Sequence, residues 1–241
     1  MTLDGTNSYL LAAPGSAAVV VVDPGPADAG HVEALMANGT VELILITHSH
    51  GDHTEASGEL HRRTGAPVRA FDPAFCRDGT PLRDGENIEA AGIRIAALAT
   101  PGHTADSVCF VLSDDGPAGS VLTGDTILGR GTTVIARPDG NLGDYLDSLA
   151  RLNDLGPMTV RPGHGPALPD LSTVSGSYLE HRRQRLDEVR RALHTLGPEA
   201  TIAAIADVVY PHIDRSVRFA AEYSVEAQLA YLDTVGDDST I

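Results

Sequence analysis

Apolar residues in the first part of the chain follow two spacings, one typical of strands and one typical of helices. Short apolar or alternating runs predict strands at residues 8–11, 18–22, 41–46, 68–71, 93–97, 107–112 and 120–122. Apolar positions three and four residues apart predict helices, such as the one that carries Val32, Leu35 and Met36 and that Asp28 can cap. Strand and helix patterns that alternate in this way indicate an α/β protein with layered sheets.

Glycine and proline mark where the predicted helices end. A short helix through Leu60 is expected to close at Gly65, and Gly156 with Pro157 should stop the next one. The apolar face of that second helix is formed by Leu142, Tyr145, Leu146, Leu149 and Leu152. After residue 170 the pattern becomes helical throughout, with helices expected at 172–196, 201–210 and 216–235. We therefore expect a larger domain over residues 1–171 and a small C-terminal helical domain over residues 172–241.

Composition narrows the classes of partner. A chain of 241 residues can bury a sizeable core, and its 33 acidic against 17 basic residues give a formal charge of -16. This charge opposes non-specific binding to nucleic acid or anionic membranes, although a local basic groove remains compatible with it. Cys76 and Cys109 form no Cys-x-x-Cys pair, which fits reduced thiols in a cytoplasmic protein. We find no apolar run long enough to span a membrane.

The segment Thr47-His48-Ser49-His50-Gly51-Asp52-His53 follows the predicted strand at 41–46 directly. Imidazole nitrogen and carboxylate oxygen are the donors that zinc prefers where thiolates are absent. His48 and His50 are two residues apart and can converge on one ion, while Asp52 and His53 can turn toward a second. An isolated histidine is more often a core or surface residue, and no role is assigned to His31, His61, His194 and His212.

Three further residues stand at the ends of strand-like runs. His103 lies in Pro101-Gly102-His103-Thr104, His164 lies in Pro162-Gly163-His164-Gly165, and Asp125 follows Gly124. Glycine at such turns lets the backbone come close to a metal while the side chain points inward. These residues are therefore candidate metal ligands.

Taken in order, His48, His50, Asp52, His53, His103, Asp125 and His164 resemble the signature of the metallo-β-lactamase fold over residues 1 to about 170. The resemblance implies a catalytic domain built as an αβ/βα sandwich, with metals at one edge of two packed sheets. It implies two zinc ions per chain, with manganese or iron as alternatives. One ion would bind His48, His50 and His103, the other Asp52, His53 and His164, with Asp125 bridging. It also implies supporting roles for Asp23 and Thr104, although a turn-forming role explains Asp23 nearly as well.

Such a centre lowers the pKa of a bridging water, so that hydroxide becomes the nucleophile and Asp52 and Asp125 take part in catalysis. It suits a phosphodiester, a thioester or a lactone. True zinc β-lactamases carry cysteine where Asp125 stands, and Cys109 lies too early in the chain to replace it, which disfavours antibiotic hydrolysis. The complete His-x-His-x-Asp-His loop also differs from the acid-substituted loop of di-iron flavoproteins and favours zinc.

Segments 129–134, 144–149, 162–166 and 178–182 resemble the β-lactamase-like protein 2 family. Members of that family are endoribonucleases that act on single-stranded RNA and carry a C-terminal winged-helix-like domain. The chain departs from the family at both ends. Met1 lies almost on the first strand, and the sequence stops at Ile241, where a β wing would be expected.

Candidate substrate contacts are Arg130, Thr132 and Thr133 in a polar loop, and Tyr178, Arg182 and Arg185 on the long helix. Two of the arginines, Arg182 and Arg185, share one helix face. The alternative is a solvated face balanced by nearby acidic residues, and Tyr178 equally fits the core. The absence of tryptophan leaves few stacking platforms for bases, which weakens the RNA hypothesis.

Four hypotheses follow. The first is a binuclear zinc hydrolase that cleaves RNA, by family resemblance. The second, which the acidic composition favours, is a glyoxalase-II-like thioesterase or lactonase that acts on a small-molecule metabolite. A mononuclear iron persulfide dioxygenase is a more distant third. The last is a non-enzymatic interaction protein whose C-terminal helices form a dimer or bind nucleic acid, but structural zinc sites are usually closed and rich in thiolates.

Overall fold

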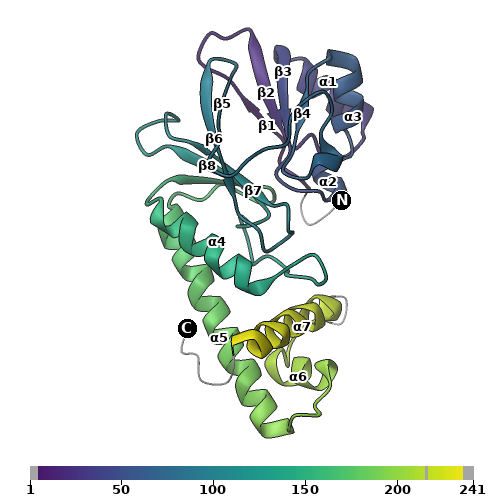
Figure 1. Cartoon of the computed structure of the whole chain (residues 1–241), viewed down its shortest axis with the longest axis vertical. Helices are drawn as coiled ribbons and strands as arrows, with labels where there is room; N and C mark the ends of the chain where they lie inside the picture. Colours follow the sequence, from purple (N-terminus) through teal and green to yellow (C-terminus); the bar gives the residue numbers. More distant parts are fainter. Residues whose placement is uncertain (1–4, 215–216, 236–241) are drawn as a thin grey trace.

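The computed structural model describes residues 5–214 and 217–235 (Figure 1). Its first sheet has the order β1-β2-β3-β4, in which β1 is antiparallel to β2 and the other pairs are parallel. The strands of this sheet are β1 (Tyr9–Leu11), β2 (Ala18–Val22), β3 (Thr40–Leu45) and β4 (Val68–Arg69). All four correspond to predicted strands.

The second sheet has the order β5-β6-β7-β8-β9 and is antiparallel except for the parallel pair β8–β9. Its strands are β5 (Asn87–Ala90), β6 (Ile93–Ala99), β7 (Val108–Leu112), β8 (Ser120–Gly124) and β9 (Thr159–Pro162). The sequence pattern missed β5 and β9. Each has only four residues, with only two of them buried, so neither gives a clear apolar run.

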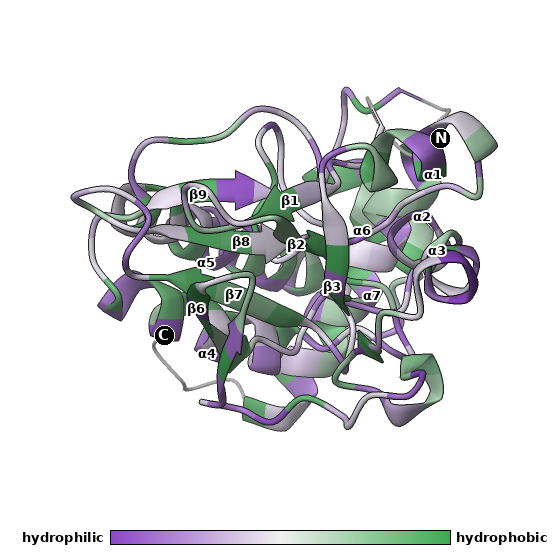
Figure 2. Ribbon diagram, turned by 90° about the horizontal axis from the view of Figure 1, so that it is seen from above, coloured by the Kyte–Doolittle hydropathy of each residue, from purple (hydrophilic) through white to green (hydrophobic). Residues whose placement is uncertain are grey.

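Alternating strand residues face two different layers. In β2, Val20 and Val22 pack into a core between the sheets together with Phe110 and Leu122. The intervening residue Val21 faces a second core beneath the helices α1 (Ala29–Met36) and α3 (Ser57–Thr64). Figure 2 shows the hydrophobic colouring that runs along these central strands.

Two helices cover the outer face of the second sheet. They are α4 (Leu142–Asp154) and α5 (Leu171–Leu196), and their core includes Val121 and Val160 from β8 and β9. The layers are therefore helix, sheet, sheet and helix, which confirms the predicted αβ/βα sandwich. The predicted helix ends agree closely, because Asp28 accepts a hydrogen bond from the His31 amide and Gly65 ends α3 in the left-handed region.

The long helix α5 belongs to two cores. Its N-terminal half packs on α4, whereas Val189 and Ala192 pack against α6 (Ile202–Val209) and α7 (Arg218–Val235). Figure 1 shows α6 and α7 gathered at the far end of α5. The predicted boundary between residues 171 and 172 falls at the first turn of this continuous helix. The division into two domains stays a prediction.

The described residues after 170 form helices and contain no strand. Residue 216, where the last helix was expected to begin, and residues 236–241, near the expected β wing, lie outside the described residues. None of the helices in the described residues is long and apolar enough to cross a bilayer.

Candidate metal centre

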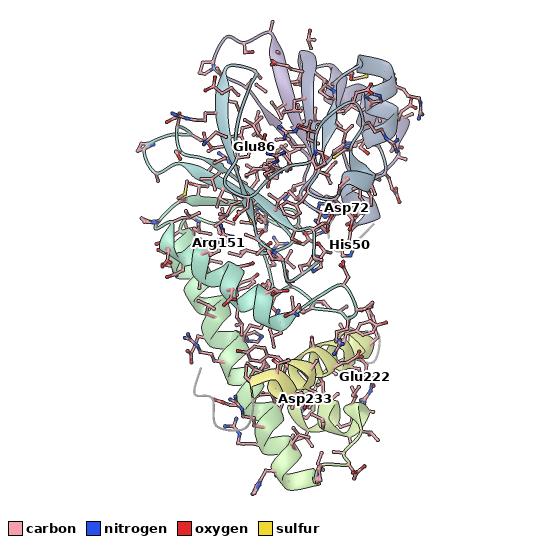
Figure 3. The ribbon with its side chains drawn as sticks, viewed as in Figure 1. His50, Asp72, Glu86, Arg151, Glu222 and Asp233 are labelled. Carbon is pink, nitrogen blue, oxygen red and sulfur yellow. The ribbon has the colours of Figure 1, made fainter. Side chains whose placement is uncertain are left out.

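Strand ends from both sheets bring the seven predicted side chains together; we call them the histidine–aspartate cluster. The loop after β3 carries His48 and His50, and the short helix α2 (Gly51–Thr54) that follows carries Asp52 and His53. The segments after β6, β8 and β9 supply His103, Asp125 and His164, respectively. His50 lies at the end of the sandwich that faces α4 and α7 (Figure 3).

Three histidines of the cluster form one group. His50 Nδ1 lies 3.0 Å from His48 Nε2 and 3.2 Å from His103 Nε2. The facing nitrogen atoms of all three lie within 4.8 Å of one another, which is the spacing of ligands around one ion. This is the predicted first ligand set.

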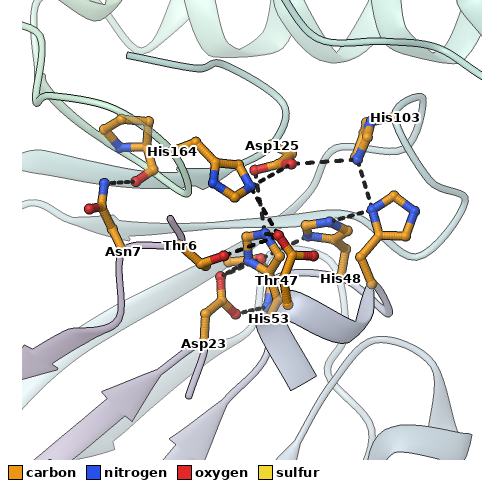
Figure 4. A network of polar contacts seen from close by, with 12 residues as sticks. Thr6, Asn7, Asp23, Thr47, His48, His53, His103, Asp125 and His164 are labelled. Carbon is orange, nitrogen blue, oxygen red and sulfur yellow. Dashed lines mark hydrogen bonds and ion pairs between the residues drawn. The ribbon is translucent and has the colours of Figure 1, made fainter. Parts of the chain in front are cut away.

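The second group contains Asp52, His53 and His164, whose facing atoms also lie within 4.8 Å of one another. His164 Nε2 lies 3.3 Å from an oxygen of Asp52 and 3.3 Å from an oxygen of Asp125. Asp125 also lies 3.5 Å from His53 Nε2 and 3.8 Å from His103 Nε2. One carboxylate thus faces both groups, which is the arrangement that a bridging ligand requires (Figure 4).

Several cluster atoms are buried and have no hydrogen-bond partner among the described residues, namely His53 Nε2, His164 Nε2 and Asp125 Oδ1. Unpartnered buried polar atoms are rare in folded proteins because their desolvation is costly. Here they face one another across a set of nitrogen and carboxylate donors. Such a set fits zinc, and also manganese or iron.

The outer ring nitrogens fix which nitrogen of each histidine faces the cluster. His103 Nδ1 donates to the carbonyl of Val134 at 2.9 Å, and His164 Nδ1 donates to the carbonyl of Gly5 at 2.9 Å. A carbonyl oxygen can only accept, so each Nδ1 carries a proton. In the neutral ring, Nε2 then carries the lone pair that faces the cluster and can bind a metal.

Asp23, for which the resemblance implies a supporting role, contacts the loop after β3 and the helix α2. Its buried carboxylate accepts hydrogen bonds from His53 Nδ1 at 2.8 Å and from the amide and hydroxyl of Thr47 at 2.7 Å each. Thr104, the other predicted support, is buried and bonds to the hydroxyl of Ser107 at 2.7 Å. It therefore shapes the turn that follows His103.

The N-terminal segment was missed by sequence reasoning. The Thr6 hydroxyl donates to Asp52 at 3.0 Å, and the Asn7 side chain donates to the carbonyls of Pro162 and Gly165 on either side of His164. These contacts join residues more than 40 positions apart in the chain, so no local motif signals them.

Two glycines allow close approach around the cluster. A Cβ atom on Gly163 would lie 2.5 Å from Asp125 Oδ1 and 2.7 Å from His53 Cε1. Gly102 has φ +139°, and a Cβ there would lie 2.4 Å from Tyr145 Cα. Only glycine fits at these turns, as the glycine-containing motifs predicted.

Burial and charge set the protonation states within the cluster. Burial, together with the neighbouring histidines, holds the pKa of His48 well below its usual value, and burial also lowers the pKa of His103. Burial acts to raise the pKa of Asp125, but the close approach of His164 and the charges of the surrounding histidines outweigh it and lower this pKa.

Burial acts to lower the pKa of His53, but Asp23 outweighs it and raises this pKa. Burial also acts to lower the pKa of His164, but Asp125 outweighs it and raises this pKa to about 9. A metal that binds these two imidazoles therefore displaces a proton, because neutral imidazole and ionised carboxylate are the forms that bind metal.

Three predicted substrate residues form hydrogen bonds that hold the loop after β8, which comprises residues 125–141. Thr133 is buried, and its hydroxyl donates to the backbone carbonyl of Asp125. The Tyr178 hydroxyl donates to the carbonyl of Gly131 at 2.8 Å, and Arg182 donates to the carbonyl of Thr133. Arg182 is only 3% exposed, so the interpretation of a solvated helix face is wrong for this residue. A substrate role for these three residues stays a prediction.

The other three candidates are Arg130, Thr132 and Arg185. Arg130 and Thr132 are exposed on the loop after β8. Arg185 pairs with Glu188 at 2.7 Å and stacks over the Tyr210 ring, so it faces the region of α6. The structure thus separates Arg185 from Arg182, although both lie on one helix.

Comparisons with known proteins agree with this geometry. The lactamase-like protein adaB of Aspergillus niger is 33% identical over 80% of this chain and 60% of its own length. A beta-lactamase-like protein 2 homolog of Caenorhabditis elegans is 33% identical over 96% of this chain and 79% of its own. The atrochrysone carboxyl ACP thioesterase of Aspergillus chevalieri is 32% identical over 79% of this chain and 61% of its own. The chain therefore spans about three fifths of two of these relatives.

Solved structures share the fold over most of the chain. The metallo-beta-lactamase family protein TTHA1429 of Thermus thermophilus has a TM-score of 0.77 and 26% identity, covering 95% of this chain and 88% of its own. TTHA1623, solved in a di-iron-bound form, has a TM-score of 0.56 and 28% identity, covering 73% of this chain and 92% of its own. The family model for the metallo-beta-lactamase superfamily matches residues 1–164, the part that contains the whole cluster. The chain belongs to the metallo-beta-lactamase superfamily.

Proposed function

We propose that this protein is a metal-dependent hydrolase whose histidine–aspartate cluster holds two divalent ions, with zinc as the first choice. The observation that carries the proposal is the set of buried donor atoms of His53, Asp125 and His164 that face one another and have no hydrogen-bond partner in residues 5–214 and 217–235. When bound, such ions supply Lewis acidity and lower the pKa of coordinated water toward neutrality.

The residues of the cluster have distinct tasks in this proposal. Asp125 faces both histidine groups and offsets part of the positive charge of two ions. Asp23 and the carbonyls of Val134 and Gly5 hold three imidazoles in one orientation. His50 is exposed and Asp52 partly so, which leaves that side of the cluster open to a substrate.

For the substrate we propose a thioester or related ester carbonyl. The arginines expected to attract a polyanion are largely engaged: Arg182 is buried, and Arg185 is paired with Glu188. The overall charge of -16 also disfavours long polyanions. A relative that is 32% identical carries the name of an acyl carrier protein thioesterase, and this supports the same chemistry.

Single-stranded RNA is the second candidate. The beta-lactamase-like protein 2 homolog matches 96% of the chain, including its C-terminal helices, and the resemblance to that family implies endoribonuclease activity. On α7, Phe219 and Tyr223 are 59% and 43% exposed and pack edge to face at 6.2 Å. Exposed aromatic rings of this kind can stack on bases, and a count of aromatic residues could not reveal their exposure.

A panel of substrates with defined metals tests the proposal. Metal-free protein is loaded with zinc, manganese or iron and assayed on an acyl thioester, a lactone and single-stranded RNA, after metal content is measured. We expect two ions per chain and thioester cleavage. Cleavage of RNA alone would show that the substrate is single-stranded RNA and not a thioester. A single iron with no hydrolysis would refute the hydrolase and favour a persulfide dioxygenase, whereas protein that binds no metal would favour an interaction role.

A further inference from the structure

The loop after β8 touches two cluster residues through its backbone and through one hydroxyl. The carbonyl of Val134 accepts the Nδ1 proton of His103 at 2.9 Å, and the Thr133 hydroxyl donates to the carbonyl of Asp125. His103 has its other ring nitrogen 3.2 Å from His50. The path of residues 133 and 134 therefore determines the direction in which the His103 imidazole points.

The helix α5 holds this loop at two places. The Tyr178 hydroxyl accepts from the Leu128 amide at 3.1 Å and donates to the Gly131 carbonyl at 2.8 Å. One turn later, the Arg182 guanidinium donates to the Thr133 carbonyl. Residues four apart lie on the same helix face, so the two side chains act on successive parts of the loop.

Arg182 is an unusual residue for a purely structural contact. Its side chain is nearly fully buried, and its Cζ lies 5.2 Å from the centre of the Tyr145 ring. Its Nε has no hydrogen-bond partner in the part of the chain that the structure describes. A buried guanidinium is costly, and the Thr133 carbonyl and the Tyr145 ring offset only part of that cost. A methionine or leucine could fill the same space, but neither could donate to Thr133.

We propose that Arg182 is a positioning residue for the metal centre. By holding the Thr133 carbonyl, it sets the neighbouring Val134 carbonyl against His103 Nδ1 and so aims His103 Nε2 at His48 and His50. The proposal rests on the metal-binding function proposed above. It means that the C-terminal helix α5, beyond the residues that the family model matches, contributes to metal affinity.

Zinc affinity, independent of turnover, tests this role. Metal-free wild-type, Arg182→Ala and Arg183→Ala proteins are titrated with zinc against a chromophoric chelator. Loss of the groups that orient a ligating histidine typically weakens metal binding about 10- to 100-fold. We expect a weakening of at least about tenfold for one ion in Arg182→Ala, with partial rescue by millimolar guanidinium. Arg183 is the next residue on α5 and is exposed, so its variant should bind zinc as the wild type does.

Circular dichroism and thermal unfolding show whether each variant folds. If Arg182→Ala does not fold, Arg182→Lys decides, because lysine keeps the charge but cannot both stack on Tyr145 and reach Thr133 as a planar group. Wild-type zinc affinity in a folded Arg182 variant would overturn the positioning role and leave the proposed function intact. A wild-type protein that binds no divalent ion would instead overturn the proposed function, and this inference with it.

Discussion

Two polar regions meet at the end of the sandwich, and they differ in what their polar atoms contact. In the histidine–aspartate cluster, buried atoms of His53, Asp125 and His164 face one another, and no described residue offers them a hydrogen bond. In the contact between α5 and the loop after β8, Tyr178 and Arg182 donate to backbone carbonyls. Buried atoms that three residues turn toward one another in this way are available to a metal, whereas Arg182, whose Nε also lacks a partner among the described residues, uses another nitrogen to hold the loop. From this difference we infer that the cluster binds the metal ions and that α5 holds the loop after β8 in place.

The largest effect should come from removing the carboxylate that faces both histidine groups. Asp125→Ala is expected to lower turnover by at least about 10³-fold, because several kcal/mol of transition-state stabilisation depend on the ions it holds. Metal content should also fall below that of the wild type. Asp147→Ala, which removes an exposed carboxylate from α4, is the matched control and should retain activity. Full turnover in Asp125→Ala would show that the unpaired cluster is not the reacting site.

A smaller but still large loss is expected from a methyl group placed behind the cluster. In Gly163→Ala the new Cβ would overlap Asp125 and His53, and displacements of about 1 Å in a catalytic site cost roughly 10²-fold in rate. Gly176→Ala on α5 is the control, since its Cβ would lie 3.6 Å from the Asn153 side chain, an ordinary van der Waals contact. That variant should be slightly more stable, because alanine favours helix over glycine. Equal activity in the two variants would contradict a tightly packed centre.

The same contrast explains how far sequence reasoning could reach. Six of the seven cluster residues were recognisable because they follow predicted strands, and the ends of strands in two packed sheets converge. His164 was recognised from its glycine-containing motif, although the strand before it, β9, was missed. The substrate contacts were harder to assign, because helical spacing places Arg182 and Arg185 on one face but does not say which is buried. Arg182 turned inward to a loop carbonyl, and Arg185 turned toward Tyr210.

Two other features had no local signal. Thr6 and Asn7 reach the cluster across at least 46 positions of sequence, so only the tertiary fold brings them there. The strand β9 has four residues, and two of them are Arg161 and Pro162. Such a short and partly polar segment does not predict a strand, and here the strand forms by parallel pairing with β8. Motifs at strand ends were thus predictable from the sequence, whereas tertiary contacts between residues far apart in the chain were not.

An intermediate effect is expected from weakening the support of His53. Asp23→Asn keeps the shape of the side chain but removes the charge that faces His53 Nδ1 at 2.8 Å. Loss of such a carboxylate typically lowers metal affinity about tenfold or more, which chelator competition measures. Asp28→Asn is the control, because asparagine caps a helix as well as aspartate does. Unchanged affinity in Asp23→Asn would mean that Asp23 only forms a turn.

The smallest effect is expected from removing the side chain of Arg185 on α5, whose contacts are partly exposed. Arg185 pairs with Glu188 and stacks on Tyr210, and both contacts are partly exposed, so Arg185→Ala should lower the free energy of unfolding by about 0.5–1 kcal/mol. Because these partners lie toward α6, kcat and KM should stay within about twofold of the wild type. A tenfold change in rate would correspond to about 1.4 kcal/mol, so the expected change in activation free energy is well below that. Thermal unfolding and steady-state kinetics on the same preparation measure both quantities. A KM raised several-fold with unchanged stability would show that this part of α5 meets substrate, and the assignment of α5 to support alone would fail.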